Sequence, residues 1–178
     1  MRQIVIDTET TGLSPAAGDR IVEIGGVELI DGLATGQQFH CYLNPDRDMP
    51  ATAQAVHGLT DGFLADKSRF ADIAEQLIGF VSGAELVIHN APFDLSFLNS
   101  EMARCGKLPI EVYCSGVVDT LRLARQLRPC ARNNLDALCA AYGVSSSHRN
   151  HHGALLDAML LAEVYVQGLM PSAVVTHE

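Results

Sequence analysis

The chain has 178 residues and a mass of 19.1 kDa, which suits one domain with a full hydrophobic core. Its 12 basic and 21 acidic residues give a net charge of −9, which argues against broad, sequence-independent wrapping of duplex DNA because such binding needs a basic face. The apolar runs are too short for a membrane span and the first residues lack the features of a secretory signal, so we expect a cytoplasmic protein.

The first part of the chain is predicted to form a three-stranded meander. The expected strands cover 3–7, 20–30 and 37–43, with turns at 11–15 and 31–32. The adjacent Gly25 and Gly26 in the second strand predict a bend or a β-bulge there.

From residue 70 onward, the pattern alternates between helices and short strands. Helices are expected over 70–81, 92–105, 120–127, 134–142 and 154–167, and strands over 84–89 and 117–119. Asn90 is expected to cap the helix that begins near Pro92, and Gly106 to end it. Strands first, then strands alternating with helices, predict an α/β fold with a mixed five-stranded sheet flanked by helices.

Two carboxylates come at the end of the first strand. Asp7 ends the run Ile4–Ile6, which is typical of a strand buried on both faces, and Glu9 lies two residues further on. If the strand continues, both side chains point to the same side of the sheet. Asp7 on its own could equally bind turn amides at the end of the strand.

Asp94 and Asp157 are the other candidate acids. Asp94 follows the fourth predicted strand, where an acid in the first turn of a helix is also favoured by the helix dipole. Asp157 lies in a helix that is apolar almost all round, so its carboxylate needs a partner. That partner is either an arginine or a metal ion.

His152 lies five residues before Asp157, in the loop that enters the last helix. From that loop its imidazole could reach over a site, or it could bind backbone at the helix start, and spacing does not separate it from His151. Four carboxylates can hold two divalent ions that clamp the attacking and leaving oxygens in phosphodiester hydrolysis. A histidine with a near-neutral pKa can then accept the proton of the attacking water.

Three segments resemble, in order, the three exonuclease motifs of the DEDDh superfamily: Asp7–Gly12, His89–Asp94 and His152–Asp157. The chain is also similar to the epsilon proofreading subunits of bacterial DNA polymerase III over Arg2–Leu13, Ile21–Leu29, Ala84–Asp94, Asn133–Tyr142 and His152–Tyr165. This resemblance implies an RNase H-like fold. It also implies a two-metal 3′→5′ DNA exonuclease that releases nucleoside 5′-monophosphates and proofreads during replication.

The resemblance also implies a role for each matched residue. The residues implied to bind two Mg²⁺ or Mn²⁺ ions are Asp7, Glu9, Asp94 and Asp157, and His152 is implied to be the general base. Thr10 and Leu13 would contact the terminal nucleotide, and His57 would stack on its base. Phe93 would pack near the separated bases, unless it is only a core residue, and Asn90 would hydrogen-bond near the phosphate.

The resemblance extends to about Gly168, so we expect an exonuclease domain over 1–170 and a short tail over 171–178. Epsilon subunits carry a C-terminal extension that binds the polymerase, and no clear clamp-binding motif follows Gln167. The expected substrate is a single-stranded or frayed DNA 3′ end. Association with a polymerase III alpha subunit and a small theta-like subunit is left open.

Two other functions are weighed against this one. An RNA 3′-end trimming exonuclease of the RNase T or oligoribonuclease type would share the same motifs, and contacts to the 2′-hydroxyl are not visible in a sequence. An inactive assembly module is the second, and the five intact catalytic positions argue against it.

Overall fold

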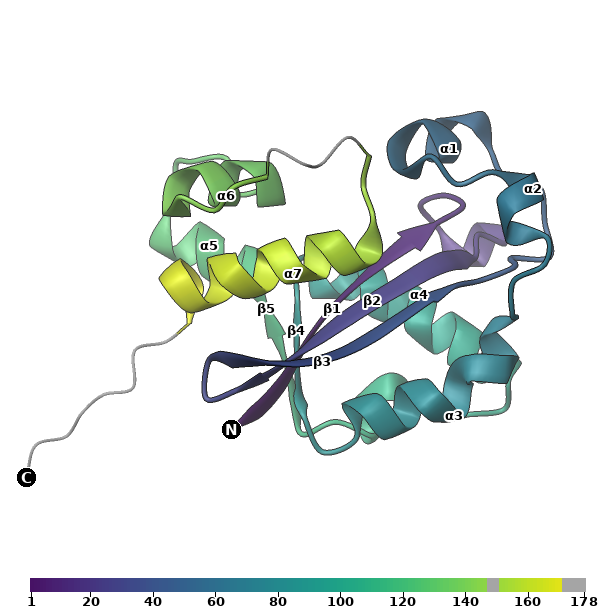
Figure 1. The fold of residues 1–178 in the computed structure, drawn as a ribbon, viewed down its shortest axis with the longest axis horizontal. Coiled ribbons are helices and arrows are strands. Elements are labelled where there is room, and N and C mark those ends of the chain that lie inside the picture. The colour runs from purple at the N-terminus through teal and green to yellow at the C-terminus, as the bar shows by residue number, and fades with distance from the viewer. Residues whose placement is uncertain (147–150, 171–178) are drawn as a thin grey trace, which may run out of the picture.

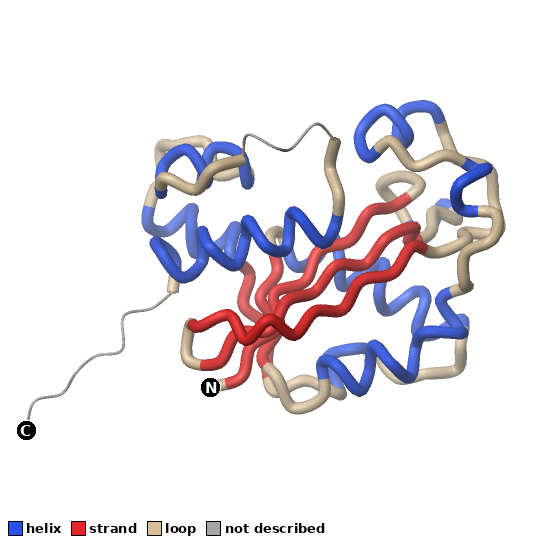
Figure 2. The backbone as a smooth tube through the Cα atoms, in the orientation of Figure 1, coloured by secondary structure: helices blue, strands red, loops and turns tan. Residues whose placement is uncertain are grey.

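A computed structural model of the chain describes residues 1–146 and 151–170. In this part, five strands form one sheet in the order β3-β2-β1-β4-β5, with helices on both faces (Figures 1 and 2). The strands are β1 (Arg2–Thr10), β2 (Ile21–Ile30), β3 (Leu33–Tyr42), β4 (Glu85–Ile88) and β5 (Gly116–Asp119). The α-helices are α1 (Ala51–His57), α2 (Asp61–Leu64), α3 (Phe70–Val81), α4 (Ala91–Arg104), α5 (Thr120–Leu127), α6 (Leu135–Tyr142) and α7 (Ala154–Val164).

The sheet is mixed, as predicted. Strands β1, β2 and β3 form the expected antiparallel meander, and β4 and β5 run parallel to β1. β1 is therefore a central strand. Because the carboxyl ends of β1, β4 and β5 meet at one edge of the sheet, the residues that follow these strands are brought together there.

The alternation of side chains along β1 separates two apolar cores. Ile4 and Ile6 pack with residues of α3 and α4 on one face of the sheet. Val5 packs with residues of α5, α6 and α7 on the other face. Since successive side chains of a strand point to opposite faces, Asp7 and Glu9 lie on the α7 side and Thr8 on the α4 side.

Two short helices, α1 and α2, were not predicted. With 7 and 4 residues they are too short for an apolar repeat to be read, although Gly58 ends α1 with a φ of 74°. β1 also continues to Thr10, so the expected strand was too short. No helix within the described residues is both long and apolar enough to cross a lipid bilayer.

The bulge expected at Gly25 and Gly26 is not found there, and the register of β2 with β3 shifts between Val27 and Leu29 instead. Gly25 pairs with Asp7, and Gly26 pairs with Ile6, in unbroken register. A Cβ atom on Gly25 would lie 2.2 Å from the backbone nitrogen of Leu155. Gly25 is instead the point where the first turn of α7 rests directly on the sheet, which only a residue without a side chain allows.

We therefore predict that Gly25→Ala lowers the stability of the fold. The added methyl group must push α7 off the sheet, because the atoms it meets are backbone, and overpacking of this kind costs about 1–3 kcal/mol or more. Chemical denaturation measures the loss. The matched control is Gly79→Ala in α3, where a Cβ meets nothing within 4 Å and we expect equal or higher stability. Equal stability of both variants would contradict the close seating of α7.

Candidate active site

Three predicted site residues meet at the carboxyl end of β1. One ligand atom each from Glu9, His152 and Asp157 lies within 4.8 Å of the others, and within the described residues this is the one such group suited to a metal ion. The Nδ1 atom of His152 lies 3.3 Å from Oδ2 of Asp157. The carboxylates of Glu9 and Asp157 are 9% and 3% exposed, whereas the His152 side chain is 47% exposed.

These three residues line a pocket of about 380 Å³ together with Asp7. β1 continues past Asp7, so Asp7 and Glu9 share one side of the sheet as predicted. The donors are carboxylate oxygens and one imidazole, which suit small divalent cations such as Mg²⁺ and Mn²⁺. The composition of the pocket therefore fits the implied metal ions.

Asp94 lies at the start of α4 and does not line this pocket. Its side chain is 3% exposed and accepts a hydrogen bond of 2.7 Å from Oγ1 of Thr8, which stands between Asp7 and Glu9 on β1. Burial raises the pKa of Asp94 to about 7, and the bond from Thr8 acts in the opposite direction. A cation placed beside Asp94 would favour its ionised form.

Asn90 directs the chain from β4 into α4, but not by the predicted side-chain cap. It stands at the N-cap position with a left-handed φ of 66°, and its side chain makes no capping hydrogen bond. Its backbone N–H donates to Oδ1 of Asp119 at 3.2 Å. Asparagine tolerates this backbone region better than most residues, and the sharp turn brings Asp94 under β1.

A second pocket, of about 360 Å³, adjoins the first and shares Thr8 and Glu9 with it. It contains four of the five residues predicted to bind the terminal nucleotide: Thr10, Leu13, His57 and Phe93. Asn90, the fifth, lines neither pocket. Leu13 is 85% exposed, so its side chain is accessible to a ligand in this pocket.

The ring of His57 is a fixed wall of the second pocket. Its Nδ1 atom accepts a hydrogen bond from the backbone of Leu59 at 3.1 Å, so Nε2 carries the hydrogen and donates to the Thr10 carbonyl at 3.2 Å. Burial lowers the pKa of His57. His57 is therefore neutral. Because both ring nitrogens are engaged in hydrogen bonds within the protein, His57 can offer a ligand the face of its ring.

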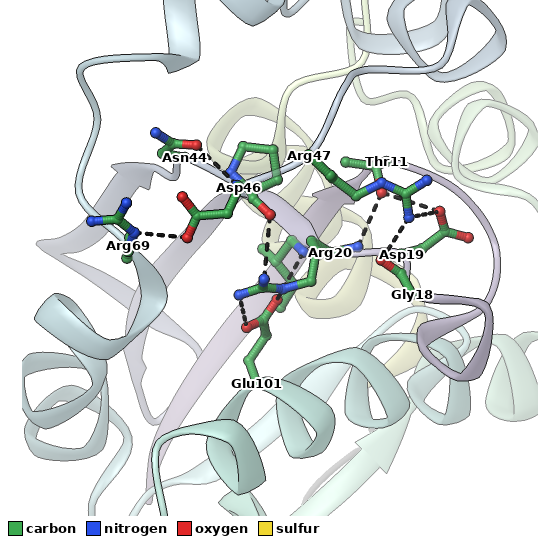
Figure 3. A network of polar contacts seen from close by, with 11 residues as sticks. Thr11, Gly18, Asp19, Arg20, Asn44, Asp46, Arg47, Arg69 and Glu101 are labelled. Atoms are coloured by element: carbon green, nitrogen blue, oxygen red, sulfur yellow. Dashed lines mark hydrogen bonds and ion pairs between the residues drawn. The ribbon is translucent and has the colours of Figure 1, made fainter.

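The loop that carries Leu13 is held by a polar network (Figure 3). Asp19 accepts hydrogen bonds of 3.1 Å from the Thr11 hydroxyl and from the Ser14 backbone, and Arg47 pairs with it at 2.9 Å. Arg20 donates two hydrogen bonds, of 2.6 and 2.8 Å, to the buried carboxylate of Glu101 in α4. These hydrogen bonds connect the loop to α4, the same helix that carries Asp94.

The structure separates His152 from His151. The backbone N–H of His152 donates to the carbonyl of Val56 in α1 at 3.1 Å, and its ring faces Asp157. The ring of His151 lies against Gly58 instead, 3.4 Å from where a Cβ would stand. Of the two adjacent histidines, His152 is the one beside the acids.

The sequence reasoning missed several residues that line the two pockets. His89, Asn134 and Asp136 also line the pocket of Glu9, His152 and Asp157, which we call the metal pocket. Asn134 caps α6 by accepting a bond of 2.9 Å from Ala137, a role that its place before an apolar run could have indicated. The α1 residues of the second pocket were missed because α1 itself was not predicted.

We predict that a carboxyl NMR titration of the protein in EDTA gives Asp94 a pKa of about 7. Thr8→Val should raise this pKa further, because it removes the hydrogen bond that favours the charged form. Thr10→Val is the control, since that hydroxyl donates to the Gly12 carbonyl instead. An Asp94 pKa near the ordinary value of 3.8 would contradict the burial described above.

Comparisons with known proteins agree with this geometry. A family model described as exonuclease matches residues 4–165. The DNA polymerase III subunit epsilon of Rickettsia felis is 49% identical over 168 residues, which cover 94% of this chain and 73% of the relative. The same subunit of Escherichia coli K12 is 48% identical over 171 residues, covering 93% and 70%.

Solved structures share the architecture. Exonuclease X in complex with 5′ overhanging duplex DNA is 30% identical, with a TM-score of 0.69 over 92% of this chain and 89% of that one. A zinc-bound complex of E. coli exonuclease I with single-stranded DNA has a TM-score of 0.80 at 21% identity, covering 93% and 40%, which supports the fold alone. The predicted RNase H-like fold is confirmed. The predicted activity, a 3′→5′ exonuclease that proofreads during replication, is also confirmed. The chain belongs to the exonuclease family and, within it, to the epsilon subunits of DNA polymerase III.

Proposed function

We propose that the two pockets at the end of β1 form an active site that hydrolyses the last phosphodiester of a DNA 3′ end and releases a nucleoside 5′-monophosphate. The observation that carries this proposal is the convergence of Glu9, His152 and Asp157 within 4.8 Å, beside a second pocket that shares Glu9. Each pocket binds a different part of the substrate: the scissile phosphate lies in the first pocket and the terminal nucleoside in the second.

Asp7, Glu9, Asp94 and Asp157 are the proposed ligands of two divalent ions. Membership of the exonuclease family implies dependence on divalent metal, and the oxygen-rich donor set favours Mg²⁺ or Mn²⁺. When bound, two such ions stabilise negative charge on the attacking and leaving oxygens. The protein's part is to hold the carboxylates from β1, α4 and α7 in a fixed relation.

His152 is the proposed general base. Its side chain is 47% exposed, so water reaches it, and the Asp157 carboxylate 3.3 Å away stabilises the imidazolium that forms when His152 takes a proton. The hydrogen bond from its backbone to Val56 fixes the loop on which it stands. His152 thus accepts the proton of the attacking water while its position is held by α1.

The second pocket is proposed to bind the terminal nucleoside. The exposed Leu13 and the ring of His57 offer apolar and aromatic surface to a base, and Phe93 packs beside them. Thr10 lies between this surface and the acids. The contact between Asn90 and the phosphate stays a prediction, because Asn90 lines neither pocket.

The proposed substrate is a single-stranded or frayed 3′ end, since unpairing costs least at a mismatched end. From the family we further propose association with DNA polymerase III through its alpha subunit and a theta-like subunit, in the cytoplasm where the bacterial chromosome is replicated. The exonuclease domain is proposed to span 1–170, and the predicted tail, 171–178, lies outside the described residues.

Digestion of labelled primers tests the proposed function. With Mg²⁺, we predict removal of nucleotides from the 3′ end, about tenfold or more faster from a mispaired terminus than from a paired one. An RNA oligomer of the same sequence should be degraded more slowly, and EDTA should stop all hydrolysis. Equal rates on paired and mispaired ends would contradict proofreading, and faster cleavage of RNA would favour the trimming function.

The adjacent histidines provide a matched pair for testing the general base. His152→Ala should lower kcat by about 10²–10⁴-fold with little change in metal affinity. His151→Ala should stay within a few-fold of the unmodified chain, because its ring lies against Gly58. Steady-state kinetics measure kcat and metal titration measures metal affinity for both variants. An inactive His151→Ala with an active His152→Ala would overturn the assignment.

A further inference from the structure

Four of the twelve Lys and Arg residues of this acidic chain lie close together in one segment. Four arginines, Arg122, Arg125, Arg128 and Arg132, fall within α5 and the loop that follows it, and we call them the arginine strip. Of the seven other Lys and Arg side chains in the described residues, six are paired with a carboxylate, and Arg104 is the exception. None of the four strip arginines forms an ion pair with a described carboxylate.

The strip presents its charge to solvent. Arg122 and Arg125 are three residues apart in α5 and exposed, so they share its outer face, while Ala124 is buried beneath. Arg128 lies over the ring of Tyr142 at 6.0 Å and donates to the Arg132 carbonyl at 3.4 Å. Arg132 is exposed. Guanidinium groups held in this way suit phosphate oxygens, which they can bind through two hydrogen bonds.

Both ends of the strip are anchored at the metal pocket. The Nδ1 atom of His89, which lines that pocket, lies 2.9 Å from Oγ1 of Thr120, the first residue of α5. The Asn133 backbone, next to Arg132, also hydrogen-bonds His89.

The direction of the strand follows from the two pockets. The second pocket, with its α1 residues, takes the terminal nucleoside, and the scissile phosphate lies in the metal pocket. The strand on the 5′ side then leaves past residues of the metal pocket that the second pocket does not share, among them His89 and the start of α6. Figure 1 shows α5 and α6 to the left of the tip of β1, and α1 above that tip.

We propose that the arginine strip binds the phosphates of the single strand immediately 5′ of the scissile bond. The inference rests on the proposed function, because that function sets the direction of the strand. In a chain of net charge −9, a patch of arginines that pair with no described carboxylate, and of which Arg122, Arg125 and Arg132 are exposed, gives local attraction for a polyanion. Its contribution is to affinity for the strand, and hydrolysis at the acids does not require it.

Binding and hydrolysis are measured separately to test this. Fluorescence anisotropy in EDTA gives the Kd of a labelled single-stranded DNA oligonucleotide without cleavage. For Arg122→Gln/Arg125→Gln, we expect the Kd to rise about tenfold at physiological salt. The slope of log affinity against log salt should become shallower by about 1.4, at about 0.7 for each phosphate contact. The matched control is Arg104→Gln/Lys107→Gln, which removes the same charge at the far end of α4 and should bind like the unmodified chain.

Hydrolysis of the p-nitrophenyl ester of thymidine 5′-monophosphate, which has no 5′ strand, isolates the acids from the strip. The strip variant should hydrolyse this ester within about twofold of the unmodified chain, as expected for a residue pair outside the reacting site. Unchanged DNA affinity of the strip variant, or equal weakening in the control, would overturn the inference. If the unmodified chain cleaves neither ester nor DNA, the proposed function fails, while the anisotropy result still decides whether the strip binds DNA.

Discussion

The contact between Gly25 and the first turn of α7 sets the geometry on which the rest of the site depends. β1 supplies Asp7 and Glu9 by strand alternation alone, but Asp157 and His152 reach them only if α7 lies directly on β2. A Cβ at Gly25 would lie 2.2–2.3 Å from backbone atoms of Ala154 and Leu155, so the helix is as close as a peptide chain allows. The result is a set of donors within 4.8 Å drawn from residues almost 150 positions apart.

The same closeness has an electrostatic cost. Glu9, Asp94 and Asp157 are each at most 9% exposed, and burying ionised carboxylates beside one another is unfavourable unless a cation compensates. Burial is the main cause of the pKa of Asp94, raised to about 7, and the Asp119 carboxylate adds to it. A cation would offset this cost, and the Thr8 hydrogen bond holds the Asp94 carboxylate in the position from which it is proposed to bind one.

The sequence predicted the parts of the site that depend on local order in the chain. The alternation along β1 placed Asp7 and Glu9 on one side, and the apolar environment of Asp157 indicated a partnered acid. The mixed sheet followed from the order of strand and helix patterns. The choice between His151 and His152 came from the motif resemblance, and in the structure the His152 ring lies beside Asp157.

Other features depend on contacts between distant residues, which a single sequence does not display. The role of Gly25 becomes visible only when α7 is in place, so the glycine pair was misinterpreted as a bulge. The left-handed backbone of Asn90 is supported by Asp119 from another strand. The arginine strip looks like ordinary surface charge until it is seen that six of the seven other described Lys and Arg side chains are paired.

If α7 completes a two-metal site on β1, calorimetric titration with Mn²⁺ should find two ions bound per chain. Asp157→Ala should bind the metal markedly more weakly, and circular dichroism shows whether this variant is folded. Metal binding that is unchanged in a folded Asp157→Ala variant would contradict a site completed by α7.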